Sequence, residues 1–75
     1  MNYIIVHRES NLITNVVSSS NTLASTKALK VIKAGDLTLD HYYRLKKKAD
    51  IAGVMVDAGD LSKHSPNFKE LLQLK

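Results

Sequence analysis

The feature that most constrains the fold is a pair of β-forming runs at the start of the chain. Tyr3–Val6 is an aromatic and β-branched run, and Leu12–Val17 is a second run rich in isoleucine and valine. Because the polar stretch His7–Asn11 separates them, the two runs predict a β-hairpin over residues 3–17. No Asn-Gly or Asp-Gly pair fixes a two-residue turn between them, so we expect a loop of about three to five residues.

Both faces of this hairpin carry apolar side chains. Side chains alternate between the faces of a strand. The second run therefore presents Leu12, Thr14 and Val16 on one face and Ile13, Asn15 and Val17 on the other. Since neither face is purely polar, we expect both to be partly covered.

Two interpretations of residues 27–34 stay open. As a helix, the segment would carry its three lysines on one side and end at Gly35. As a strand, it would suit Val31 and Ile32 and would support a hairpin that is barely stable alone. We favour the strand, preceded by a polar loop at residues 18–26.

Residues 38–58 show the strongest helical pattern. Thr38 is the predicted N-cap, and Gly59 is the predicted stop. Apolar side chains recur there at spacings of three and four, namely Tyr42, Leu45, Ala49, Ala52 and Val56. Gly53 could break the helix, and residues 54–56 could then form a short strand.

A second helix is predicted over residues 66–73, after a loop at residues 60–65. Ser65 suits the cap of this helix and Pro66 its first position. The order of elements predicts an α+β domain of two layers, in which one long and one short helix pack on a hairpin and a third strand. Residues 1–75 are expected to form this single domain.

The size of the chain limits its core. A chain of about 60 residues buries only about 60% of its extended surface, and this chain has 75 residues and no cysteine to form a disulfide. Oligomerisation or docking on a larger protein would supplement so small a core. No apolar run approaches the roughly 20 residues that span a bilayer, and Met1–His7 lacks the basic start and cleavage site of a signal peptide. We therefore expect neither membrane insertion nor secretion.

Positive charge gathers in the middle of the chain. The net charge is +4, and residues 27–48 hold seven of the basic side chains, Lys27, Lys30, Lys33, Arg44, Lys46, Lys47 and Lys48. These cations could contact phosphates, and Tyr42 and Tyr43 could stack on bases. Arginine is the side chain that most often recognises base edges, and residues 27–48 contain only one. Any binding of nucleic acid would therefore be independent of the nucleotide sequence. We favour the alternative, a solvated or protein-contacting surface.

The residues that could carry chemistry form no recognisable catalytic or metal motif. The histidines His7, His41 and His64 are not spaced three or four apart, as a helical metal site requires. Asp57–Asp60 resembles part of a calcium loop, but the alternating ligands and the final glutamate are missing, so we predict a turn. Ser18–Ser20 lack the context of a nucleophile. We expect no enzyme activity, no cofactor, no metal and no small-molecule substrate.

The hairpin is the predicted interaction surface. If Tyr3–Val6 is an edge strand, it has no internal lysine or proline to block pairing with another chain. A partner could then add a strand to it. The candidate partner interface consists of Tyr3, Ile5, Ile13 and Val17. The sequence thus favours a non-enzymatic protein-interaction module that binds itself or a larger assembly.

The organisation of residues 3–45 resembles that of small accessory proteins of tailed bacteriophages. The resemblance rests on the strand-turn-strand opening, the Val/Ile-rich segment after a short linker, and a helix starting near Leu39–Tyr43. It implies a phage structural or accessory protein, located in the cytoplasm or the virion, and it assigns a role to no individual residue. Two alternatives stay open, a sequence-independent nucleic-acid-binding protein and a small inhibitor of a host enzyme or defence complex.

Overall fold

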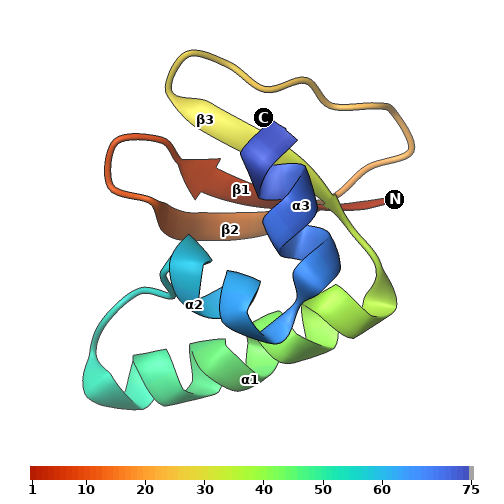
Figure 1. The fold of residues 1–75 in the computed structure, drawn as a ribbon. Helices are drawn as coiled ribbons and strands as arrows, with labels where there is room; N and C mark the ends of the chain where they lie inside the picture. Colours follow the sequence, from red (N-terminus) through yellow and green to blue (C-terminus); the bar gives the residue numbers. More distant parts are fainter. Residues whose placement is uncertain (75) are drawn as a thin grey trace.

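The computed structural model describes residues 1–74 as a sheet followed by three helices (Figure 1). The strands are β1 (Asn2–His7), β2 (Leu12–Ser18) and β3 (Leu29–Ala34), and the helices are α1 (Asp36–Ala52), α2 (Ala58–His64) and α3 (Pro66–Leu74). The sheet is antiparallel throughout, with the strand order β2-β1-β3. The predicted α+β class, the hairpin and the third strand are therefore confirmed.

The hairpin closes through the four residues Arg8–Asn11, a loop of the predicted length. Asn11 has a φ of 59°, in the left-handed region that asparagine adopts more readily than most residues. Its amide donates to the carbonyl of His7 at 2.8 Å. Farther along, Ile5 pairs with Asn15 and Val6 with Ile13, so the register shifts by one residue between them. This irregularity is of the β-bulge type, which bends a strand locally.

The strand order corrects the prediction that Tyr3–Val6 lies at an edge. β1 pairs with β2 on one side and with β3 on the other along its whole length. All four residues of this run are buried. The physical reason is that the central position pairs both edges of the most continuously apolar run, whereas an edge position would leave one row of its backbone groups unpaired.

The two outer strands are partly covered by the chain itself. At the start of β2, the amide of Ile13 donates to the carbonyl of Val56 at 2.9 Å, and the amide of Ala58 donates to the carbonyl of Asn11 at 2.9 Å. On β3, the amide of Val31 donates to Ser25 Oγ at 3.0 Å. These contacts reduce the length of strand edge that is open to another chain.

One face of the sheet packs against the helices. Figure 1 shows α3 in front of the strands, α2 below β2, and α1 below α2. The buried cluster on this face consists of Ile4, Val6, Ile13, Ile32, Ala34, Tyr42, Ala49, Val56, Ala58, Leu61 and Phe68. Phe68 is the largest fully buried side chain of the described residues. This face therefore holds the main core.

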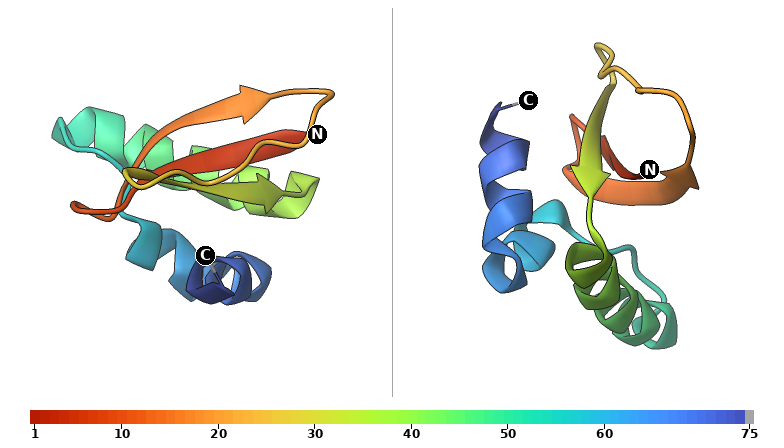
Figure 2. Two further views of the ribbon diagram at one scale, coloured as in Figure 1. Left: turned by 90° about the horizontal axis from the view of Figure 1, so that it is seen from above. Right: turned by 90° about the vertical axis from the view of Figure 1, so that its right-hand side faces the viewer.

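The opposite face is covered by the segment between β2 and β3, which lies on the other side of the sheet from α3 (Figure 2, right). Its smaller cluster consists of Tyr3, Ile5 and Val31, with Val17, Leu23 and Leu29 packed against it. The Tyr3 hydroxyl donates to the carbonyl of Asn21 at 3.3 Å and so ties the segment to the sheet. The expectation that both faces are partly covered is confirmed.

The predicted helix over residues 38–58 ends at Ala52, and residues 53–57 are not helical; residues 54–56 form no strand either. α1 ends because Gly53 adopts a left-handed conformation with a φ of 73°, and the amides of Gly53 and Val54 donate to the carbonyls of Asp50 and Ala49. A glycine in this position is a common helix C-terminus. At the other end, the N-cap is Gly35 rather than Thr38, whose side chain is buried inside the first turns of α1.

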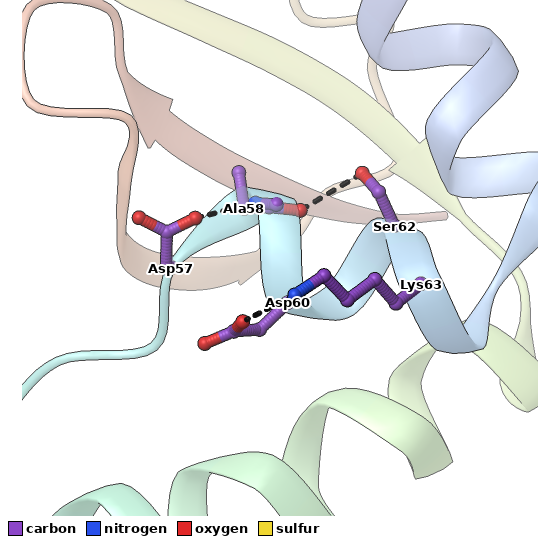
Figure 3. A network of polar contacts seen from close by, with 6 residues as sticks. Asp57, Ala58, Asp60, Ser62 and Lys63 are labelled. Carbon is purple, nitrogen blue, oxygen red and sulfur yellow. Dashed lines mark hydrogen bonds and ion pairs between the residues drawn. The ribbon is translucent and has the colours of Figure 1, made fainter.

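The residues predicted as a turn and a loop form α2 (Figure 3). Asp57 is its N-cap, and the carboxylate accepts a hydrogen bond from the amide of Gly59 at 2.6 Å. The Ser62 hydroxyl donates to the carbonyl of Ala58 at 2.8 Å. Gly59 therefore lies in the first turn of a helix rather than at the end of one, because the aspartate before it supplies a side-chain cap.

Candidate functional site

The predicted partner interface does not form one accessible surface. Tyr3, Ile5 and Ile13 are buried, and Val17 is half-buried. Ile13 belongs to the cluster under the helices, whereas the other three belong to the cluster under the 19–28 segment. These side chains stabilise two separate cores in this structure.

The basic side chains of β3 and of the residues before it point in different directions. Lys30 Nζ reaches the carbonyl of Leu72 on α3 at 3.4 Å, while Lys27 and Lys33 are exposed. Because side chains alternate along a strand, Lys30 and Lys33 lie on opposite faces of the sheet. These three lysines therefore do not make one cationic surface.

The remaining basic side chains lie on the exposed part of α1. Arg44 pairs with Asp40 at 3.0 Å, and Lys46 pairs with Asp50 at 3.2 Å. Both pairs are largely exposed, so each stabilises the fold by little. Within residues 1–74, Lys47 and Lys48 make no ion pair. The surface of α1 therefore carries net positive charge.

Exposed apolar side chains gather near the end of α1. Tyr43, Ile51, Val54 and Met55 have exposed fractions of 54%, 83%, 59% and 49%, and we call these four residues the α1-end patch. Tyr43 lies about two turns before Ile51 on α1 and about 80° from it around the helix axis, with Lys47 midway between them along the chain. Val54 and Met55 follow directly after Gly53, where the chain leaves the helix.

A hollow of about 330 Å³ lies between the α1-end patch and β2. Tyr43, Val54 and Met55 line it from the patch, Tyr42, Lys46 and Asp50 from the rest of α1, and residues 13–16 from β2. The rings of Tyr42 and Tyr43 meet edge to face with their centres 5.3 Å apart. The lining of the hollow is thus mixed: aliphatic and aromatic side chains, the polar side chains of Thr14 and Asn15, and the charged pair Lys46–Asp50.

Tyr42 joins this hollow to the core. Its side chain belongs to the buried cluster on the helix-covered face. Burial raises the pKa of its phenol above the ordinary value, the positive charge of Lys46 opposes that rise, and Tyr43 and Asp50 add to it. The hydroxyl is therefore kept neutral over a wider range of pH than a free tyrosine, which excludes it as a readily ionised group near neutral pH.

A second hollow, of about 720 Å³, lies where α1, α2 and α3 meet. His41 of α1 and His64 of α2 both line it, and their rings are stacked with centres 6.4 Å apart and an interplanar angle of 16°. Sequence reasoning missed this pair, because the two histidines are far apart along the chain and meet only through the packing of the helices.

The residues with potential for chemistry stay dispersed in the rest of the structure. Within residues 1–74, no group of three or more histidine, cysteine, aspartate or glutamate side chains is close enough to enclose a metal ion. None of the described helices is both long and apolar enough to pass through a membrane.

Comparison with models of protein families, with curated proteins and with solved structures finds no match to this chain.

Proposed function

We propose that this protein is a non-enzymatic interaction module, and that the α1-end patch docks an acidic segment of another protein. The observation that carries the proposal is the concentration of exposed apolar side chains in Tyr43, Ile51, Val54 and Met55, next to a hollow. A group of exposed apolar side chains is a common feature of protein-binding surfaces, because their burial against a partner is favourable.

The charge around the patch favours an acidic partner. Positive side chains outnumber negative ones on this part of α1. The four basic residues are Arg44, Lys46, Lys47 and Lys48, and the two acidic residues are Asp40 and Asp50. Opposite charges at the rim of an interface speed association and select the partner. A second copy of this chain would bring two positively charged α1 helices together, so self-association through this patch is the less favourable arrangement.

The patch also favours protein over nucleic acid as the partner. Ile51, Val54 and Met55 offer aliphatic surface, which gains nothing from contact with phosphates. A role in a phage assembly and a role as an inhibitor of a host protein both stay predictions, and either is compatible with an acidic protein partner.

Selection from a display library of random linear peptides tests the proposal. We expect the protein to retain peptides that combine aspartate or glutamate with large apolar residues, because both features complement the patch. The substitutions Ile51→Ser and Met55→Ser, made together, should weaken binding of the retained peptides by about tenfold or more, which corresponds to about 1.4 kcal/mol.

The matched control is the pair Leu37→Ser and Leu74→Ser, which removes two exposed apolar side chains far from the patch. We expect this control to bind the peptides as the native chain does. Failure to retain any peptide, or an equal loss in both double variants, would overturn the proposal. Retention of random duplex or single-stranded DNA that weakens steeply with salt, in place of peptides, would favour the nucleic-acid alternative instead.

A further inference from the structure

The backbone of β2 is open along the outer edge of its second half. Met1 and Ser19 exchange two hydrogen bonds between amine or amide and carbonyl, at 2.9 Å and 2.8 Å. Residues that exchange bonds in this way recur at every second position of an antiparallel pair. Val17 therefore directs its amide and carbonyl toward β1, whereas Val16 and Ser18 direct theirs toward the outer edge. No other group of residues 1–74 bonds to them there.

The outer edge of β3, by contrast, is closed by the chain itself. The amides of Leu29 and Val31 donate to Thr26 Oγ1 at 3.1 Å and to Ser25 Oγ at 3.0 Å. The carbonyl of Leu29 accepts from the amide of Thr26 at 2.8 Å. Lys33, farther along β3, is exposed, and lysine on an edge strand discourages pairing with another strand. Because β2 contains neither lysine nor proline, the open edge of the sheet is that of β2.

The first part of the β2 edge already pairs with an extended segment of the same chain. Leu12 forms an antiparallel bridge with Asp57, and the amide of Ile13 donates to the carbonyl of Val56 at 2.9 Å. Beyond the bulge, the groups of residues 16–18 continue the same row of donors and acceptors. The edge therefore already accepts extended chain at one end and stays open at the other.

The hollow beside the α1-end patch borders this edge. Four consecutive residues of β2, 13–16, line it. Since successive side chains of a strand point to opposite faces, a hollow under one face alone would be lined by alternate residues. Tyr43, Val54 and Met55 form the facing wall. A strand added along residues 16–18 would thus hold the side chains of one of its faces beside the patch.

We propose, on the basis of the function proposed above, that the acidic segment docks as an added β-strand. Its backbone pairs with Val16 and Ser18, and every second side chain enters the hollow beside the α1-end patch. Addition of a strand to an open sheet edge gains affinity from main-chain hydrogen bonds and selectivity from pockets for alternate side chains. Lys46 lines the hollow and Lys47 is exposed next to it, so acidic residues of the segment find cations there.

A proline scan of the edge tests the pairing, with the acidic peptide recovered most often from the random library as the probe. Ser18→Pro removes an amide that faces outward, so the pairing of β2 with β1 should be kept, as circular dichroism can check. We expect this variant to bind the peptide about tenfold or more weakly, because a main-chain hydrogen bond is lost and the ring obstructs the added strand. Ser18→Ala is the matched control, which keeps the amide and should bind as the native chain does.

Two measurements on the native chain do not depend on the folding of a variant. Peptides methylated at single backbone nitrogens should lose affinity only at every second position, since alternate amides of an added strand face β2. Amide exchange at Val16 and Ser18 should be fast in the free protein and slow with the peptide bound. Val17, which is already paired with β1, should change less.

The outcomes separate this binding mode from the docking proposal itself. Binding that survives both Ser18→Pro and methylation at every position overturns the added strand and leaves docking at the α1-end patch intact. Equal losses in Ser18→Pro and Ser18→Ala also overturn the added strand. If no acidic peptide binds at all, both proposals fail. A dimer of the native chain that Ser18→Pro disperses and the peptide does not would place a second copy on the edge instead, and would overturn the acidic segment as its occupant.

Discussion

The molecule uses the same kinds of apolar side chain in two opposite ways. On the helix-covered face of the sheet, Phe68, Leu61 and Ile32 are fully buried in the main core. At the end of α1, the α1-end patch leaves Ile51, Met55 and their two neighbours in solvent. The difference teaches that apolar content alone does not identify a core in this chain, since position relative to the sheet decides whether an apolar side chain is buried or stays exposed to solvent.

The largest expected effect comes from the core side of this comparison. Phe68→Ala should lower the free energy of unfolding by about 3–5 kcal/mol, because it removes a fully buried ring and leaves a cavity. A domain of this length has only about 4–11 kcal/mol in total at the usual stability per residue. Urea unfolding followed by circular dichroism measures the loss, and a decrease of less than about 1 kcal/mol would contradict the assignment of the main core.

A smaller effect on the free energy of unfolding is expected at Gly53, where α1 ends and the chain continues into Val54 and Met55 of the α1-end patch. Gly53→Ser should cost about 1–2 kcal/mol, since the φ of 73° at Gly53 is unfavourable for any residue with a β-carbon. The same substitution at Gly35 is the matched control, because Gly35 has an extended backbone with a φ of −82° and open space around it. A serine there could also cap α1, so its melting temperature should be unchanged or higher. Equal losses in the two variants would be inconsistent with this account.

A third effect should be visible only in alkaline solution. Burial raises the pKa of Tyr42 above its ordinary value of 10.0, so the folded state retains the phenolic proton more strongly than the unfolded state. Its contribution to stability is therefore complete below pH 10 and is lost as the pH rises through the folded pKa. Melting temperatures between about pH 8 and about pH 11 should fall less steeply in Tyr42→Phe than in the native chain. Identical slopes would argue against burial as the cause.

The smallest effect on stability is expected in the patch itself. Ile51→Ser and Met55→Ser together should change the free energy of unfolding by no more than about 0.5 kcal/mol, because both side chains are already exposed to solvent. Thermal unfolding of the double variant beside the native chain is the measurement. A loss of several kcal/mol would show that the patch belongs to the core, and the comparison would fail.

Local patterns predicted much of the fold. The runs in residues 3–17 specified the hairpin because β-branched side chains and a polar turn act over short distances, and the Ser65-Pro66 pair marked the start of α3. The central position of β1 was mispredicted because strand order depends on where β3 returns, and nothing local to Tyr3–Val6 encodes that.

The candidate sites were harder to predict from sequence than the elements. A cap by Asp57 was a recognisable signal for α2, although the glycine two residues later suggested a helix end. By contrast, the contact between His41 and His64 depends on the angle at which α1 meets α2, and no spacing along the chain reports it. The patch was missed because residues 54–56 were expected to form a short strand if Gly53 broke the helix, whereas they form no strand and leave Val54 and Met55 exposed.

Mapping of a bound peptide by amide chemical shifts tests most directly whether the α1-end patch docks a partner. The probe is the acidic peptide recovered most often from the random library, titrated into the isotope-labelled native chain. The account predicts that the largest shifts cluster at Tyr43, Ile51, Val54 and Met55 and along residues 13–16, and that they vanish in the Ile51→Ser/Met55→Ser double variant. Shifts confined to another surface, or unchanged in that variant, would contradict it.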